Sequence, residues 1–191
     1  MATSALLRSA RSSRGLSQRA LAAAARIHQP RIAALESGTE DATVGRLTAL
    51  LSKLGTQLTL IPSNVRPVWA AGADVQRALQ LGNVRTAWRE VIQLNDDLRS
   101  ADPAICVALS VAAPAPTGDA RFDALLAAVT DAVLSARRLP RPAWLDEDSR
   151  QLKGPWDVEQ IPELQAAARK ATPAAIKRHG IYLDQAVLQS V

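Results

Sequence analysis

The chain has 191 residues, 48% of them apolar, and a formal net charge of +5 at pH 7, which suits one or two small domains with a hydrophobic core. No long apolar run and no charged leader with an apolar segment is present, so we expect a soluble, cytoplasmic protein without a membrane partner. The single Cys106 excludes an internal disulfide, and two histidines far apart in the sequence make a metal site or cofactor unexpected.

Four helices are predicted in the first sixty residues, and their expected ranges are 4–13, 17–26, 28–37 and 43–54. Ser17 can cap the free N–H groups of the second helix, Pro30 fits the first turn of the third, and Gly38 ends it. Apolar residues recur at helical spacing in both middle helices and would form one buried face. Two short helices joined by a tight turn predict a helix-turn-helix; the alternative is a plain αα-hairpin with a solvated polar edge.

Positive charge is concentrated in the same part of the chain. Residues 1–66 hold nine Lys/Arg against three acidic residues, whereas residues 67–191 hold fourteen against fifteen. A basic segment is the electrostatic footprint of phosphate binding, so the asymmetry points to nucleic acid as the partner of the first segment. The alternative, that arginine only solubilises an Ala-rich domain, accounts for the sign of the charge but not for its distribution.

The stretch LSQRALAAAARIHQPRIAALESG, residues 16–38, resembles the helix-turn-helix of phage repressor/Cro-type (XRE-like) regulators. The family pattern of LSQ, then LA, then a closing I-x-x-[IL]-E-x-G matches in register. The resemblance implies that double-stranded operator DNA is the partner, that Gln18 touches a phosphate and that Gln29 reads a base. It also implies that Glu36 ties the recognition helix to the domain, while Arg26 stands where the family often has glycine in the tight turn.

Outward-facing residues at the start of the second helix of this motif would meet base edges in the major groove. Gln29 can bond bidentately to adenine and Arg31 to guanine or phosphate, whereas Ala34 would touch at most a thymine methyl. Contacts to phosphate fix the orientation of a domain without reading sequence. They are expected from Arg11, Arg14, Gln18, Arg19, Arg26 and His28.

Residues 56–61 (TQLTLI) alternate between polar and apolar and predict a short strand that Pro62 ends. A single strand in a helical domain needs a partner for its backbone groups. We expect Leu58 and Leu60 to lie in an antiparallel pair with the same strand of a second protomer, which gives a homodimer. A similar layout occurs in antitoxin regulators of bacterial toxin–antitoxin operons. The alternative is pairing with residues 181–183 of the same chain.

The remainder predicts a linker over residues 63–72 and a helical domain over residues 73–191. Its expected helices are 75–81, 84–98, 103–111, 119–138, 172–180 and a last one from 184, with a short strand at 181–183. Residues 139–161 carry three prolines and few regular spacings, which indicates an ordered or binding loop. Trp144 and Trp156 within it are candidate partner contacts, because tryptophan is enriched at interface hot spots; the alternative is that both rings close the core.

The last third of the chain contains RPAW, GPW and TPAAIKRHGIYLDQAVL, and it resembles the C-terminal region of some actinobacterial antitoxins encoded beside nucleotidyltransferase-like toxins. The resemblance implies a toxin as the protein partner. No phosphate-binding Gly-rich loop, nucleophile elbow or metal-ligand cluster is visible, so no catalytic residue is expected. The carboxylate run at residues 146–148 has no histidine nearby in the sequence and predicts a solvated or partner-facing loop.

The sequence therefore predicts a mostly α protein, with a bundle of about four helices and a dimerisation strand in residues 1–62 and a helical partner-binding domain after the linker. The functional hypothesis is a dimeric repressor that also serves as the antitoxin of a toxin–antitoxin system. One alternative is a one-component repressor whose second domain senses a small molecule. The other is an interaction module in which the helix-turn-helix contacts only protein.

Overall fold

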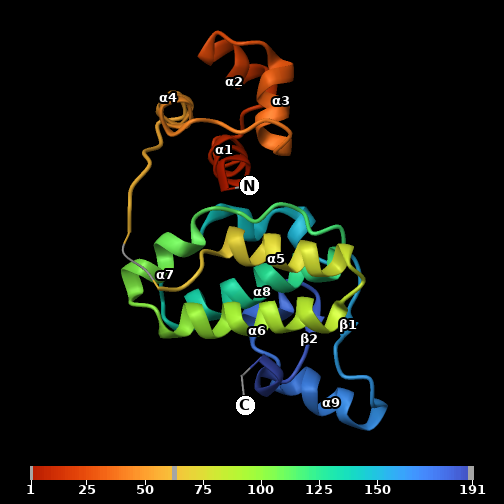
Figure 1. The fold of residues 1–191 in the computed structure, drawn as a ribbon. Helices are drawn as coiled ribbons and strands as arrows, with labels where there is room; N and C mark the ends of the chain where they lie inside the picture. The colour runs from red at the N-terminus through yellow and green to blue at the C-terminus, as the bar shows by residue number, and fades with distance from the viewer. Residues whose placement is uncertain (1, 62–63, 189–191) are drawn as a thin grey trace. The chain divides into compact units, whose positions relative to one another are not determined.

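The computed structural model describes residues 2–61 and 64–188, and the chain divides into two compact units (Figure 1). The first is formed by residues 1–62 and 112–114, and the second by residues 63–111 and 115–191. Both are helical, which confirms the predicted fold class. Among the described residues, no helix is long and apolar enough to span a lipid bilayer.

The first unit contains the four predicted helices, α1 (Ala2–Ser12), α2 (Gln18–Ala25), α3 (Gln29–Ser37) and α4 (Val44–Lys53). Helices α1 and α2 each contact both α3 and α4. Leucine, isoleucine and alanine side chains form the shared core: Leu7, Ala10, Leu21, Ala22, Ile32, Leu35, Ala42, Leu47, Leu50, Leu51 and Leu54. Each fully buried leucine or isoleucine stabilises the fold by about 1.5–3 kcal/mol relative to exposure. This core holds α2 and α3 against each other.

The strand predicted at residues 56–61 is not formed within the single chain, where these residues lack regular secondary structure. Leu58 and Leu60 are exposed, with 95% of the surface of Leu60 accessible. The intramolecular alternative was wrong, because the strand β2 (Ile181–Tyr182) pairs in parallel with β1 (Trp156–Asp157) instead. Pairing of residues 56–61 with a second copy stays a prediction.

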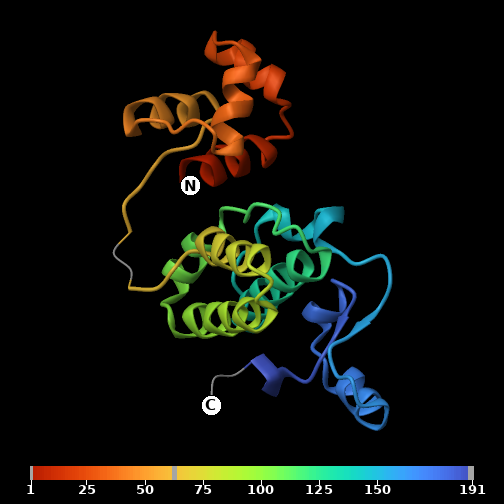
Figure 2. The ribbon, with the colours of Figure 1, turned by 45° about the vertical axis from the view of Figure 1, so that its right-hand side comes forward.

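The second unit is arranged around helix α8 (Ala120–Ala136), which Figure 1 and Figure 2 show beside α5 (Val68–Gln80) and α6 (Val84–Ser100). From Ala124 to Leu134 every residue of α8 is buried. A helix that is apolar on nearly every side is stable only when other elements cover it. Those covering elements, besides α5 and α6, include α7 (Pro103–Ser110), α10 (Ala174–Lys177) and the 3-10 turns η1 (Ala143–Asp146) and η2 (Asp148–Arg150).

The structure differs from the predicted elements at three places in this unit. Helix α5 begins at Val68, so the second half of the predicted linker is helical. Val68, Ala71 and Val75 are buried, and their burial outweighs the roughly 1 kcal/mol that Gly72 costs inside a helix. Helix α9 (Pro162–Ala171) was not predicted. The last predicted helix is only a 3-10 turn, η3 (Gln185–Leu188), and residues 189–191 lie outside the described range.

Trp144, which the sequence suggested as a partner contact, lies in the core instead. It lies in η1 with 5% of its surface exposed, and its indole Nε1 donates to the backbone oxygen of Ser110 at 2.9 Å. The Arg150 guanidinium stacks over the ring at 5.5 Å from its centroid. A ring that is buried and hydrogen-bonded closes the core and offers no surface to a partner. Trp156, in β1, is half-buried.

Candidate nucleic-acid interface

The turn between α2 and α3 is built by a left-handed residue. Arg26 has φ 55° and ψ 44°, its N–H donates to the oxygen of Ala23 at 3.2 Å, and the Ile27 N–H donates to the oxygen of Ala22 at 3.0 Å. These two bonds form a Schellman motif, which satisfies carbonyl groups at the end of a helix. An arginine in this conformation costs about 1 kcal/mol. The strain is the expected consequence of arginine in place of the family's glycine.

Helix α3 begins with its polar residues at the surface. His28, Gln29, Pro30 and Arg31 are exposed, and Ala34 is half-buried. The opposite face of the helix is fixed in the core by its buried apolar side chains, Ile32 and Leu35. The structure thus places the predicted base-reading glutamine and arginine where a DNA groove can reach them.

A buried carboxylate connects α1, α2 and α3. Glu36 is 2% exposed and accepts from Arg11 Nε at 2.7 Å and Nη2 at 2.9 Å. Gln18 Nε2 donates to the same carboxylate at 3.0 Å. The hydrogen bond to Glu36 raises the pKa of Arg11 above its ordinary value. Arg8 adds a bond from Nη2 to the backbone oxygen of Glu36 at 2.6 Å.

This arrangement corrects one predicted phosphate contact. Arg11 makes a bidentate ion pair inside the unit and also donates to the backbone oxygen of Leu16 at 2.6 Å, so its donors are engaged within the fold. The role that the family resemblance implies for Glu36, tying the recognition helix to the domain, matches these contacts.

The same chain of contacts ends on Gln29. Its Nε2 donates to Gln18 Oε1 at 3.1 Å, so the Gln18 amide bridges the buried carboxylate of Glu36 and the exposed side chain of Gln29. A side-chain amide has two N–H donors and one carbonyl acceptor. Gln29 therefore keeps one donor and its acceptor, which is the pair that matches adenine N7 and N6. The buried carboxylate of Glu36 thus fixes the orientation of the exposed Gln29 amide through Gln18.

The remaining cations of the unit differ in how they are held. Arg14 Nη2 donates to the Gly55 backbone oxygen at 3.1 Å, and Arg31 Nε lies 3.6 Å from Glu40 Oε2, with both side chains half exposed. An exposed pair of this kind contributes little stability, so a phosphate or base can replace it. Arg19 and Arg26 are exposed and form no ion pair with the described residues. They are the cations of α2 and its turn that are open to a phosphate.

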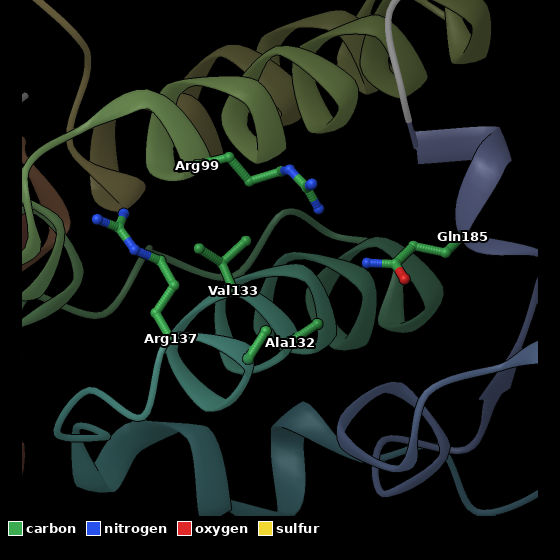
Figure 3. Close-up of a pocket in the computed structure, with 6 residues that line it drawn as sticks. Arg99, Ala132, Val133, Arg137 and Gln185 are labelled. Carbon is green, nitrogen blue, oxygen red and sulfur yellow. The ribbon is translucent and has the colours of Figure 1, made fainter.

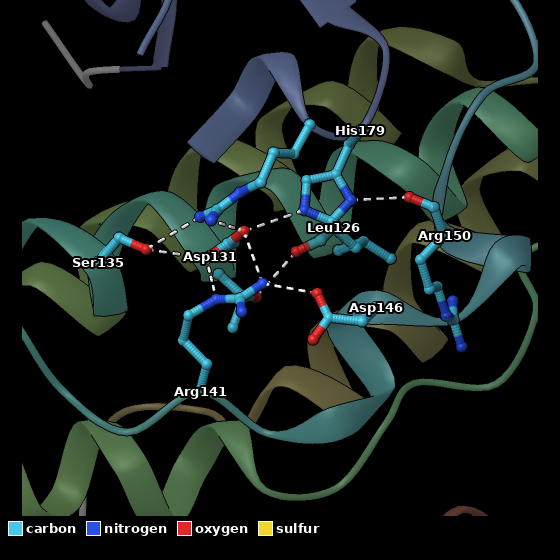
Figure 4. Close-up of polar contacts among 9 residues, drawn as sticks. Leu126, Asp131, Ser135, Arg141, Asp146, Arg150 and His179 are labelled. Atoms are coloured by element: carbon cyan, nitrogen blue, oxygen red, sulfur yellow. Dashed lines mark hydrogen bonds and ion pairs between the residues drawn. The ribbon is translucent and has the colours of Figure 1, made fainter. Parts of the chain in front are cut away.

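A second polar cluster, which the sequence analysis missed, lies in the second unit (Figure 4). Asp131 on α8 is fully buried, and three basic side chains and a hydroxyl surround it. The contacts to its carboxylate come from Arg141 Nε at 2.6 Å and Nη2 at 3.1 Å, Arg178 Nη2 at 2.9 Å, His179 Nε2 at 3.3 Å and Ser135 Oγ at 2.9 Å. Such a network fixes α10 and the segment after α8 to the central helix.

The comparisons with known proteins concern the first unit. A family model described as Helix-turn-helix matches residues 7–61, a little under a third of the chain. Neither the search of curated proteins nor that of solved structures found a match. The matched residues include the α2–turn–α3 motif and the Glu36–Gln18–Gln29 contacts described above. The match and the geometry together show a helix-turn-helix domain in the first unit, which supports a DNA-binding transcription regulator.

Proposed function

We propose that the protein is a transcriptional repressor that reads operator DNA through α3 and binds it as a homodimer. The observation that carries the proposal is the oriented amide of Gln29, held by Gln18 and Glu36 at the exposed start of α3. Gln29 reads adenine in the major groove, and Arg31 leaves its exposed pair with Glu40 to reach guanine or a phosphate. Ala34 allows close approach and contacts at most a thymine methyl.

Sequence-independent affinity comes from the basic groups around the motif. Arg19 and Arg26, at the start of α2 and in its turn, are open to phosphate, and His28, Arg14 and Gln18 add further contacts. Each neutralised phosphate releases counterions, so the affinity must fall steeply with salt. These contacts position the domain on the duplex, while Gln29 and Arg31 select the site.

Dimerisation is proposed to use residues 57–61. Their backbone groups form no hydrogen bonds with other described residues, and the side chains of Leu58, Leu60 and Ile61 are exposed. Antiparallel pairing with the same segment of a second copy satisfies the backbone groups and covers the leucines. A two-fold dimer places two α3 helices in successive major grooves, so we expect a palindromic operator with half-sites one helical turn apart.

The first prediction separates base reading from phosphate binding. On the best site selected from random duplex DNA, Gln29→Ala should weaken binding roughly tenfold to a hundredfold, while binding to unrelated DNA stays unchanged. Arg19→Ala should weaken both equally and reduce the slope of log affinity against log salt by about 0.9. Binding is measured by fluorescence anisotropy from low to physiological salt. Matched controls are Gln80→Ala and Arg89→Ala, which remove an exposed glutamine and an exposed arginine from the second unit.

Three results would count against this reading. Loss of selected-site and unrelated binding together in Gln29→Ala would make Gln29 a positioning residue. An unchanged salt slope in Arg19→Ala would remove Arg19 from the phosphate contacts. Absence of DNA binding by the wild-type chain, with native far-UV circular dichroism, would favour the interaction-module hypothesis.

We further propose that the second unit binds a protein toxin, so that the protein is the antitoxin of a toxin–antitoxin pair. Support comes from the resemblance of the last third of the chain to antitoxins encoded beside nucleotidyltransferase-like toxins. Trp156 remains the candidate contact from the sequence analysis, because its ring is half-buried, with the Arg121 guanidinium 5.7 Å from its centroid.

Co-expression with the product of the adjacent gene tests this second proposal. We expect a stable complex and suppression of that gene's toxicity, and we expect Trp156→Ala to weaken the complex at least tenfold. Trp88→Ala, which truncates another half-buried tryptophan of the same unit, is the control. An adjacent transporter or metabolic gene, or a chain that neither binds nor neutralises the neighbouring product, would overturn the antitoxin role and leave the repressor standing.

A further inference from the structure

A cavity of about 260 Å³ opens in the second unit where α6, α8 and η3 meet (Figure 3). The C-terminal turns of α6 and α8 form two of its sides, and Gln185 of η3 forms the third. Its lining residues are Arg99, Ala132, Val133, Ala136, Arg137 and Gln185. The floor is formed by the apolar side chains of Ala132, Val133 and Ala136, and the rim carries the polar ones.

The rim carries two positive charges and, among its lining residues, no acidic one. Arg99 and Arg137 form no ion pair with the described residues; Arg137 Nη1 donates to the Leu98 backbone oxygen at 2.8 Å, which fixes that side chain. Figure 3 shows Arg99 and Gln185 extending toward each other over Ala132 and Val133. A guanidinium, an amide and an apolar floor therefore face one shared space.

The position of the two arginines at helix C-termini has an explanation that needs no ligand. Cations are stabilised at helix C-termini, where the backbone dipole is negative, and both arginines lie at such ends. The dipole does not account for the apolar hollow between them or for an amide on the third side. A molecule that satisfies all three features has a negative head group and a small apolar body.

We propose that this cavity binds a small organic monocarboxylate. Its carboxylate accepts from Arg99, and from the Gln185 amide, while its apolar part lies on Ala132 and Val133. The volume is slightly below that of sites for drug-sized molecules, so the ligand has a single small ring or a short chain. The site lies wholly within the second unit, and the inference does not depend on the proposed DNA reading.

Benzoate is the probe for the first experiment, with benzamide as its neutral counterpart and inorganic phosphate as an anion without an apolar body. Titration of the full chain is followed by calorimetry and by tryptophan fluorescence, because all four tryptophans belong to the second unit. We expect saturable 1:1 binding of benzoate that weakens with salt, and at least tenfold weaker binding of both benzamide and phosphate.

Variants test the assignment of the residues. Arg99→Gln should weaken benzoate binding at least tenfold and Gln185→Ala severalfold, whereas Arg89→Gln, an exposed arginine on the same helix outside the cavity, should bind as the wild type does. Three results would overturn the proposal. The first is absence of saturable binding by the wild-type chain at millimolar benzoate, and the second is equal benzoate binding in Arg99→Gln. The third is equal binding of phosphate, which would show general attraction of anions.

Discussion

Asp131→Ala is expected to lower the free energy of unfolding of the second unit by about 3–5 kcal/mol, because it removes one partner from a buried ionic cluster. The carboxylate has no exposed surface, accepts from Arg141, His179 and Ser135, and forms an ion pair with Arg178. Without it, the buried parts of these donors lose their acceptor while the repulsion among the cations remains. Asp131→Asn keeps the volume and should cost less, since an amide oxygen still accepts hydrogen bonds.

The same cluster predicts how stability depends on pH. Burial by itself would raise the pKa of Asp131, but the hydrogen bonds from His179, Arg141 and Ser135 outweigh burial and hold that pKa well below its ordinary value. A carboxyl group whose pKa is lower in the folded state stabilises the fold above its unfolded pKa, about 3.9. This stabilisation is complete above about pH 5 and is lost as the pH falls toward the folded pKa, with a slope of up to about 1.4 kcal/mol per pH unit.

Tryptophan fluorescence measures this effect in the full chain, since no tryptophan lies in residues 1–62. Urea unfolding between pH 7 and pH 3 should show the stability of the wild-type second unit falling below pH 5, and a shallower fall in Asp131→Asn. The other ionisable groups that face the cluster, Asp146 through Arg141 and the His179 ring, are present in both proteins. Asp148→Ala, at an exposed carboxylate of η2, is the control and should behave as the wild type. Equal pH slopes in wild type and Asp131→Asn would show that Asp131 does not titrate as described.

The helix-turn-helix could be predicted from the sequence because its determinants are local. Ser17, Pro30 and Gly38 mark helix ends within a few residues of the apolar positions they belong to, and the structure confirms each. The left-handed turn at Arg26 was likewise expected, because similar helix-turn-helix sequences often have glycine at this position of the tight turn. Sequence rules predict such helix ends because the capping residue lies within one helical turn of the end that it determines.

The ionic cluster and the cavity could not be predicted for the opposite reason. Asp131 meets Arg178 and His179 across more than forty residues, and only packing of α10 on α8 brings them together. In the sequence these residues look like an isolated carboxylate in an apolar helix and a basic pair at the end of a short predicted helix. Helix α9 was missed although Leu164, Ala167, Ala168 and Ala171 recur at helical spacing, because three of these four are alanines and only Ala168 is buried. Its proline start and its helix-forming composition were the available indications.

Glu36→Ala is expected to destabilise the first unit by about 3–5 kcal/mol, which for a small four-helix domain is most of its stability. The buried carboxylate holds the Arg11 guanidinium and the Gln18 amide, and so connects α1, α2 and α3. Far-UV circular dichroism and amide hydrogen exchange should show loss of one unfolding transition. The tryptophan transition of the second unit should remain, because the first unit contains no aromatic residue. Loss of both transitions together would show that the units do not unfold independently.

Glu36→Gln separates the role of this residue in folding from its role in DNA reading. The glutamine keeps the shape of the side chain and one acceptor oxygen, so the domain should fold and lose less stability than in Glu36→Ala. The neutral amide can no longer serve both Arg11 Nε and Nη2 together with Gln18, and Gln18 then ceases to orient Gln29. We expect selectivity for the selected operator over unrelated DNA to fall severalfold, with the salt slope unchanged.

Glu40→Gln, which alters only the exposed partner of Arg31, is the control and should leave stability within about 0.5 kcal/mol of the wild type. A Glu36→Gln variant that folds and keeps full selectivity would show that Gln29 orients itself without the buried carboxylate.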